Sequence, residues 1–211
     1  MPIRVLIADD HAIVRKGVIQ IFSEKPDIVL VAEADTGSGA IDLARNHEAD
    51  IFILDLNMPG PGGLEVLAQL NSEHPDLPVL ILTMHDEEQY GVRLLKAGAA
   101  GFLAKNAAPD KLVEAIRHIA GGRRYISPSL AEALLEHMES PDPAPPHESL
   151  SDREFQVFQE IAKGNTTSGI AEKLSLSAKT ISTYRSRVLT KLSLSSNAEI
   201  VRYALERGII D

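Results

Sequence analysis

Five short apolar runs alternate with five helical stretches in residues 3–120, and this alternation restricts the possible folds more than any other feature. An unbroken apolar run such as 51–54 is typical of a strand that is buried on both faces of a parallel sheet. Strands alternating with helices predict right-handed crossovers and helices on both faces of that sheet. We therefore expect an α/β fold with a five-stranded parallel sheet in the flavodoxin-like order 2-1-3-4-5.

The expected elements have these limits. The strands are 3–8, 28–32, 51–54, 78–83 and 101–104, and the helices between and after them are 12–23, 37–46, 64–70, 87–97 and 109–120. In the first helix, apolar residues recur at helical spacing, so we expect an inward face made of Ile13, Val14, Val18, Ile21 and Phe22.

The remainder of the chain has a different character. A further helix is expected from Pro128 to about Met138, and residues 140–147 then hold four prolines in eight positions. Proline interrupts helices and central strands, so this stretch predicts a semi-rigid linker. From Ser151 onward the pattern is helical only, at 152–163, 167–174, 178–192 and 197–207, with a tight turn at 175–177. We predict an α/β domain at 1–122, a linker helix and Pro-rich linker at 123–149, and an all-α domain at 150–211.

Charge is distributed unevenly between the two expected domains. Residues 148–211 carry 9 Lys and Arg against 8 Asp and Glu, although the whole chain has a net charge of −9. The acidic part favours cations and the more basic part favours phosphates. The chain has no cysteine, which excludes disulfides, thiolate metal sites and thiol nucleophiles. It shows neither a signal-peptide pattern nor an apolar run of about 20 residues, so we expect a cytoplasmic protein with no membrane partner.

Polar residues stand where the expected strands end. Asp9 and Asp10 follow the first strand, Asp55 the third, Thr83 ends the fourth, and Lys105 follows the fifth. In a parallel sheet these ends lie on one edge, where carboxylates would repel one another unless a cation such as Mg²⁺ lies between them. An aspartate can accept a phosphoryl group, which a hydroxyl and an ammonium can hold. The set predicts an aspartyl-phosphate site, although each residue alone is equally typical of a turn, a cap or a surface.

The helix expected at 178–192 is cationic and contains no acidic residue. Its apolar side chains form one stripe, and the opposite face carries lysines, arginines and hydroxyls. A short helix, a tight turn and a longer polar-faced helix indicate a helix-turn-helix, whose second helix enters the DNA major groove. The alternative is an ordinary solvated basic surface.

The first part of the chain resembles the receiver domain of two-component response regulators. The resemblance covers residues 1–122 and rests on Asp9-Asp10, Asp55 with Met58-Pro59-Gly60, Thr83, and Gly101-Phe-Leu-Ala-Lys105. It implies that Asp55 is phosphorylated by a sensor histidine kinase. It also implies that Asp10, Asp55 and the Asn57 carbonyl hold Mg²⁺, with Asp9 acting through water.

The same resemblance implies roles at the far side of the site. Thr83 and Lys105 would bind the phosphoryl group. Phe102 matches the aromatic residue that turns inward in this family when the threonine moves. Thr83 and Phe102 together would therefore form a switch, although Phe102 is also a plausible plain core residue.

Residues 150–211 resemble the LuxR-type DNA-binding domain, and the whole chain resembles a NarL/FixJ-type response regulator. The resemblance rests on 150–158, Ile161-Ala-Lys-Gly, 170–174 and 179–192. It implies double-stranded DNA as partner, with Ser182, Thr183 and Ser186 facing base edges. Phosphate contacts would come from Lys179, Tyr184, Arg187 and Lys191. The full set of expected contacts is Lys179, Thr180, Ser182, Thr183, Tyr184, Ser186, Arg187 and Lys191.

The last expected helix presents Ile200, Tyr203, Ala204 and Arg207 on one side. We expect this side to pair two copies in a homodimer, because two-fold pairing doubles the contacts of one helix-turn-helix. The alternative is that these residues only close the core of the small domain.

Two other functions fit parts of the pattern. An aspartyl-phosphate phosphohydrolase of the haloacid-dehalogenase kind would place its nucleophile in an Asp-x-Asp on the first strand, whereas the candidate here is Asp55 on the third. A DNA-binding regulator with a phosphorylation-independent receiver would not need the complete set Asp9, Asp10, Asp55, Thr83 and Lys105. We therefore expect a regulator of transcription and not an enzyme.

Overall fold

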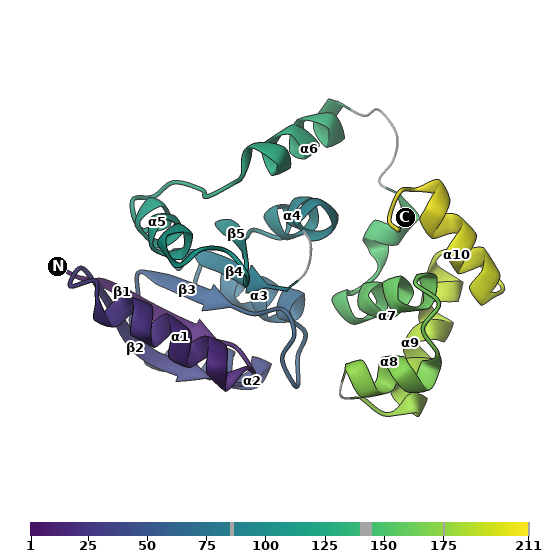
Figure 1. The fold of residues 1–211 in the computed structure, drawn as a ribbon, viewed down its shortest axis with the longest axis horizontal. Helices are drawn as coiled ribbons and strands as arrows, with labels where there is room; N and C mark the ends of the chain where they lie inside the picture. Colours follow the sequence, from purple (N-terminus) through teal and green to yellow (C-terminus); the bar gives the residue numbers. More distant parts are fainter. Residues whose placement is uncertain (85–86, 140–144, 175, 211) are drawn as a thin grey trace. The chain divides into compact units, whose positions relative to one another are not determined.

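A computed structural model describes residues 1–84, 87–139, 145–174 and 176–210 (Figure 1). The chain divides into two compact units, Met1–Ser140 and Pro141–Asp211. Most of the predicted Pro-rich linker, residues 140–144, lies outside the described residues, as does residue 175 of the predicted tight turn. Each unit is described here by itself.

The first unit is built on a five-stranded parallel sheet with the order β2-β1-β3-β4-β5, which confirms the predicted fold class. The strands are β1 (Ile3–Ala8), β2 (Ile28–Ala34), β3 (Ile51–Leu54), β4 (Val79–Thr83) and β5 (Gly101–Ala104). Strand β2 is two residues longer than predicted, because Glu33 and Ala34 still pair with Ile7 and Ala8. The apolar pattern ends at residue 32 because residue 33 is polar. One face of this edge strand is exposed, so the strand can continue through a polar residue.

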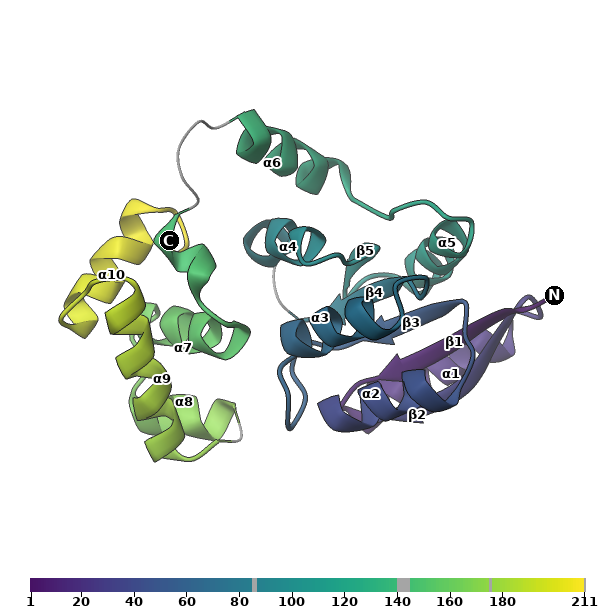
Figure 2. The same cartoon turned by 180° about the vertical axis from the view of Figure 1, so that it is seen from behind.

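Six helices accompany the sheet in the described part of this unit. They are α1 (Ala12–Ser23), α2 (Gly37–Asn46), α3 (Gly63–Glu73), α4 (Glu87–Lys96), α5 (Pro109–Ala120) and α6 (Pro128–Glu139). Helix α1 lies in front of the sheet in Figure 1, and α2 and α3 lie in front of it in Figure 2. Because side chains alternate along a strand, each strand contributes side chains to the packing on both faces of the sheet. The core shared with α1 and α5 includes Val5, Ile7, Ile53, Leu80, Phe22 and Ile116.

The predicted inward face of α1 was wrong in one residue. Val18 and Phe22 are buried, and Val14 and Ile21 pack against the core, but Ile13 is 82% exposed. Positions 14, 18 and 21 follow one helical stripe, whereas position 13 lies about 100° away from position 14 around the helix axis. The apolar pattern therefore contained one residue more than the core can cover.

The segment after α5 returns to the sheet before it forms α6. Tyr125 forms a bridge with Gly101 of β5, and its N–H donates to the carbonyl oxygen of Ala100 at 2.9 Å. Leu130 of α6 is 1% exposed and packs against Gly91 of α4. A Cβ at Gly91 would lie 2.5 Å from Leu130 Cδ1, so this close approach of the two helices depends on glycine.

The second unit consists of helices around a small core. They are a 3₁₀ helix at Pro146–Ser149, then α7 (Asp152–Ala162), α8 (Thr167–Lys173), α9 (Ala178–Lys191) and α10 (Asn197–Glu206). Four serine or threonine side chains accept a backbone N–H at the starts of α7 to α10, as N-caps do: Ser151, Thr166, Ser177 and Ser196. The core includes Phe158, Ile170, Ile181, Val188 and Ile200.

The end of the predicted linker needs a correction, because residues 146–147 belong to the 3₁₀ helix and not to an extended segment. Pro146 is its first residue, where proline is tolerated because that N–H would have no helical partner. Among the described helices of both units, none combines the length and the apolarity needed to cross a membrane.

The Gly91–Leu130 contact can be tested by substitution. Gly91→Ala adds a Cβ against a buried leucine, so it should lower the stability of the first unit by about 1–3 kcal/mol, the usual cost of overpacking. Gly17→Ala is the matched control, because nothing lies within 4 Å of its added Cβ. It should raise stability by about 0.5–1 kcal/mol, since glycine weakens a helix interior.

Denaturant unfolding of the full chain measures both effects. Hydrogen exchange should locate the Gly91→Ala loss in α4 and α6, and adding Leu130→Ala should relieve part of it. Equal stabilisation by the two alanines would contradict the proposed packing.

Candidate functional site

The backbone of the sheet fixes the acidic site. Hydrogen bonds of the sheet continue past the strand ends, where Asp55 N–H donates to Ala8 O at 2.8 Å and Lys105 N–H donates to Thr83 O at 2.8 Å. Asp9 extends β1 in the same way. The strand-end residues identified in the sequence therefore meet on one edge of the sheet, as the parallel topology requires.

A single ammonium lies between two of the buried carboxylates. Lys105 Nζ is 2.7 Å from Asp55 Oδ2 and 2.9 Å from Asp9 Oδ2, and all three side chains are at most 4% exposed. Burial raises the pKa of Asp55, the charge and hydrogen bond of Lys105 oppose this rise, and the negative charge of Asp9 adds to it. The pKa of Asp55 remains above its ordinary value, so one ammonium does not fully offset the burial of the site.

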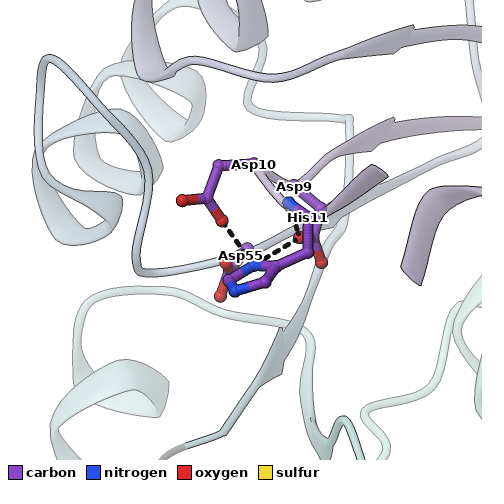
Figure 3. A group of neighbouring side chains, drawn as sticks. All are labelled: Asp9, Asp10, His11 and Asp55. Atoms are coloured by element: carbon purple, nitrogen blue, oxygen red, sulfur yellow. Dashed lines mark hydrogen bonds and ion pairs between the residues drawn. The ribbon is translucent and has the colours of Figure 1, made fainter. Parts of the chain in front are cut away.

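Two carboxylate oxygens at the site receive no hydrogen bond from the described residues, Asp9 Oδ2 and Asp55 Oδ1. The contact of Asp9 Oδ2 with Lys105 is an ion pair without hydrogen-bond geometry. One oxygen each of Asp9, Asp10 and Asp55 lie within 4.8 Å of one another, and Figure 3 shows these side chains close together. Buried acceptors without donors are expected to receive a cation. The acidic pocket therefore fits a metal ion.

His11 belongs to this pocket and was missed in the sequence. Its Nδ1 lies 2.6 Å from Asp10 Oδ1 and 3.3 Å from Asp9 Oδ1, and its backbone N–H donates to Asp9 Oδ1 at 2.8 Å. The available signal was its position directly after the acidic pair. Asp10 and His11 form the open side of the site, with side chains that are 32% and 55% exposed.

The remaining predicted residues of this unit are Thr83, Phe102 and Asn57. Thr83 has no exposed surface, and Phe102 is 2% exposed. Phe102 pairs with Ile81 in the sheet, two positions before the Thr83–Ala104 pair. The backbone of Asn57 hydrogen-bonds the Asp55 carboxylate and opposes the rise of its pKa. The proposed metal contact of the Asn57 carbonyl stays a prediction.

In the second unit, α9 presents a polar face beside a buried apolar one. Ile181 and Val188 are fully buried, whereas Lys179, Ser186 and Arg187 are exposed. The guanidinium of Arg187 lies 6.0 Å from the centre of the Tyr184 ring, which limits where its charge can move. Neither Lys179 nor Arg187 forms an ion pair with any residue that the structure describes.

The hydroxyls on this face are already oriented by the helix. Ser182 and Thr183 donate to the carbonyl oxygens of Ala178 and Lys179, at 2.9 and 3.1 Å. Their oxygens therefore present lone pairs outward, while their protons are used inside the helix. Thr180 differs, because its hydroxyl lies 2.7 Å from that of Ser177 at the start of the helix.

Lys191 has partners within the unit, and its predicted phosphate contact stays a prediction. Its Nζ lies 2.6 Å from Glu154 Oε2 and donates to Ser149 O at 3.1 Å, so it joins α9 to α7 and to the 3₁₀ helix. Burial raises the pKa of Glu154, but Lys191 and the backbone of Ser151 outweigh this and hold the pKa below its ordinary value. Lys191 is committed to an ion pair within the unit, which helical spacing alone does not show.

The predicted pairing surface on α10 needs a correction in two residues. Ile200 and Ala204 have no exposed surface in the isolated chain, so the core covers them and they cannot face a second copy. Tyr203 is partly exposed, and its hydroxyl lies 3.0 Å from His147 Nδ1. Arg207 is exposed. Apolar periodicity identifies a covered face but does not tell whether the core or a partner covers it.

The fold and the two sites define a class of protein, a phosphoacceptor α/β domain joined to a helix-turn-helix domain. The family model described as "Response regulator receiver domain" matches residues 5–117. The model described as "Bacterial regulatory proteins, luxR family" matches residues 148–204. Both families consist of regulators and not of phosphohydrolases, so the enzyme alternative is excluded.

Related proteins match over almost the whole chain. Response regulator GacA of Pseudomonas aeruginosa is 39% identical over 99% of this chain and 98% of its own length. Response regulator UvrY of Escherichia coli K12 is 37% identical over 98% of this chain and 95% of its own. The chain therefore belongs to the NarL/FixJ family of two-component response regulators, and within it to proteins similar to GacA and UvrY.

Solved structures of response regulators also match this chain. RcsB from Salmonella enterica serovar Typhimurium, bound to a promoter in the presence of the phosphomimetic BeF₃⁻, matches with a TM-score of 0.61 and 26% identity. That match covers 96% of this chain and 98% of the RcsB chain. A LuxR-family response regulator from Aurantimonas matches with a TM-score of 0.60 and 35% identity, over 66% of this chain and all of its own.

The different settings of Lys191 and Arg187 lead to opposite expectations. Lys191→Ala leaves Glu154 without its cation and should lower the stability of the second unit by about 1–3 kcal/mol. Arg187→Ala should leave stability unchanged and weaken binding to all duplexes. If Arg187 contacts one phosphate, the salt dependence of binding should fall by about one unit of slope. Thermal unfolding and DNA titrations at several salt concentrations measure both, and a stable Lys191→Ala with a reduced salt slope would contradict this division.

Proposed function

We propose that Asp55 accepts a phosphoryl group from a sensor histidine kinase and that this modification controls specific DNA binding by the second unit. The observation that carries the proposal is the buried Asp9–Lys105–Asp55 arrangement. It leaves Asp55 Oδ1 without a hydrogen bond from the described residues, which is what a nucleophile or a metal ligand requires.

The chain's own residues account for most of the transfer chemistry. An Asp55 oxygen attacks phosphorus, the O–P bond forms, and the P–N bond to the kinase imidazole breaks, so the imidazole nitrogen keeps the electron pair and takes up a proton. The Lys105 ammonium donates a hydrogen bond to Asp55 Oδ2 before transfer. It is therefore positioned to neutralise the charge of the phosphoryl oxygens after transfer. Thr83 would donate its hydroxyl to the phosphoryl group. Asp10, Asp55 and the Asn57 carbonyl would hold Mg²⁺, with Asp9 acting through water, and the ion would supply further charge neutralisation.

Control of DNA binding by phosphorylation requires a conformational change. Exposed charges are screened beyond about 8 Å at physiological salt, so the phosphoryl charge cannot act directly on a DNA surface in another domain. Thr83 and Phe102 are proposed as the element with two arrangements. Thr83 ends the strand that leads to α4, and α4 contacts Leu130 of α6 through Gly91. Helix α6 therefore lies between the switch and the second unit along the chain.

We further propose that α9 enters the major groove of double-stranded DNA, with Ser182, Thr183 and Ser186 at base edges and Lys179 and Arg187 at phosphates. Tyr184 and Lys191 would add phosphate contacts, and Thr180 would complete the DNA-binding set. The active form is proposed as a homodimer, for which Tyr203 of α10 and Arg207, which follows α10, remain available. The relation to RcsB supports both proposals, because one solved RcsB structure contains two dimers on two DNAs. We place the protein in the cytoplasm, where a kinase and DNA can both reach it.

The phosphoacceptor assignment is tested with acetyl phosphate and Mg²⁺. Intact-protein mass spectrometry should show one added phosphoryl group on the native chain and none on Asp55→Asn. Asp10→Ala should lose most of the labelling together with its Mg²⁺ dependence, because one of the proposed ligands is gone. His47→Ala is the control, since its exposed ring lies outside the pocket. Equal labelling of Asp55→Asn and the native chain would refute the assignment.

The proposed coupling between phosphorylation and DNA binding through Thr83 is tested separately. Phosphorylation should tighten operator binding by the native chain, within the 5–150-fold range of typical allosteric coupling, roughly 1–3 kcal/mol. Thr83→Ala should still be phosphorylated on Asp55 but should lose most of this gain. A conservative Thr83→Ser keeps the hydroxyl and should retain it. DNA titrations of both variants with and without phosphoryl donor decide the point. If Thr83→Ala keeps the full gain, the receiver acts by another route or DNA binding is independent of phosphorylation.

A further inference from the structure

His11 places a nitrogen atom beside the carboxylate oxygens of the acidic pocket. Its Nδ1 belongs to a group of potential ligand atoms, from Asp9, Asp10, His11 and Asp55, that all lie within 4.8 Å of one another (Figure 3). The ring is held close to Asp10 and Asp9, at 2.6 and 3.3 Å. Atoms that share one metal ion in proteins lie at such separations, because each is about 2.0–2.5 Å from the ion.

A second observation points to a ligand in this pocket. Asp9 Oδ2 and Asp55 Oδ1 are buried, and neither receives a hydrogen bond from the described residues. Asp9 and Asp55 are each 1% exposed, so water cannot readily serve these oxygens. A pocket with oxygen acceptors alone favours Mg²⁺, which prefers oxygen and retains water. An added imidazole nitrogen changes this preference toward ions later in the first transition row.

We propose that His11 is a ligand for late first-row divalent cations such as Co²⁺, Ni²⁺ and Zn²⁺, which occupy the phosphoacceptor pocket in competition with Mg²⁺. This inference rests on the proposed divalent-cation site. In a neutral imidazole whose proton is on Nε2, the lone pair of Nδ1 is available to bind a metal ion without a change of charge.

A simpler role would be that His11 only orients Asp10. The two roles differ in cation selectivity. A positioning role affects every cation that uses Asp10, including Mg²⁺. A ligand role affects nitrogen-preferring ions and leaves Mg²⁺ binding nearly unchanged, because Mg²⁺ gains little from imidazole.

Calorimetric titration of the full-length, metal-free protein with Mg²⁺ or Co²⁺ separates these roles. His11→Ala and His11→Asn should each weaken Co²⁺ binding by about tenfold or more, while Mg²⁺ binding stays within about twofold. The asparagine can still donate to Asp10, so it preserves orientation without the nitrogen ligand. His47→Ala removes an exposed histidine elsewhere and should change neither affinity. Excess Mg²⁺ should displace Co²⁺ from the native chain.

The visible absorption bands of bound Co²⁺ give an independent measurement. They should differ between the native chain and both His11 variants, because nitrogen and water split the cobalt d orbitals differently, and they should be unchanged in His47→Ala. Unchanged Co²⁺ affinity and spectrum in the His11 variants would overturn the proposal. Equal loss for Mg²⁺ and Co²⁺ in His11→Ala would assign only a positioning role and would also overturn it. Failure of the native chain to bind Mg²⁺ would instead overturn the divalent-cation site itself.

Discussion

The buried ammonium of Lys105 is the interaction on which the first unit depends. It lies within 3 Å of oxygens from Asp9 and Asp55, in a place where no carboxylate could remain charged without help. The compensation is incomplete, because burial still keeps the pKa of Asp55 raised. A folded-state pKa above the unfolded one means that ionisation of Asp55 opposes folding, and that this opposition grows as the pH rises from the unfolded pKa to the folded pKa and is absent below both. This destabilisation accompanies a carboxylate oxygen that receives no hydrogen bond from the described residues. That oxygen is available to a cation or to a phosphoryl group.

The sequence predicts this arrangement because topology converts strand ends into neighbours. Residues as distant as Asp9, Asp55 and Lys105 meet once a parallel sheet is recognised, since all strands end on one edge. What the sequence does not predict are contacts that depend on side-chain rotation and on which surface covers an apolar face. His11 belongs to the pocket through the direction of its ring, and Ile13 is exposed although it fits a helical pattern.

The same limit applies to the second unit. Apolar spacing identifies Ile200 and Ala204 as covered, but only the packed structure shows that the core covers them. The sequence predicts a phosphate contact for Lys191, but it does not show that this ammonium is paired with a buried glutamate. An ion pair between α7 and α9 joins residues 37 positions apart, and no local pattern records such a contact. Element limits are predicted more accurately, because caps such as Ser151 and Ser177 are local.

The setting of Lys191 has a consequence for how DNA binding can be controlled. With that cation held by Glu154, three cations of α9 form no ion pair with the described residues: Lys179, Arg187 and the half-buried Arg185, which donates to Asn197 Oδ1. Each phosphate that a protein neutralises adds to affinity, so a helix with so few such cations contributes little alone. The hydroxyls of Ser182 and Thr183 present acceptors and discriminate bases weakly. One copy of the second unit alone is therefore expected to bind DNA weakly. If the receiver changes only how often the second units of two copies bind DNA together, DNA occupancy would change strongly while the fold of each domain stays the same.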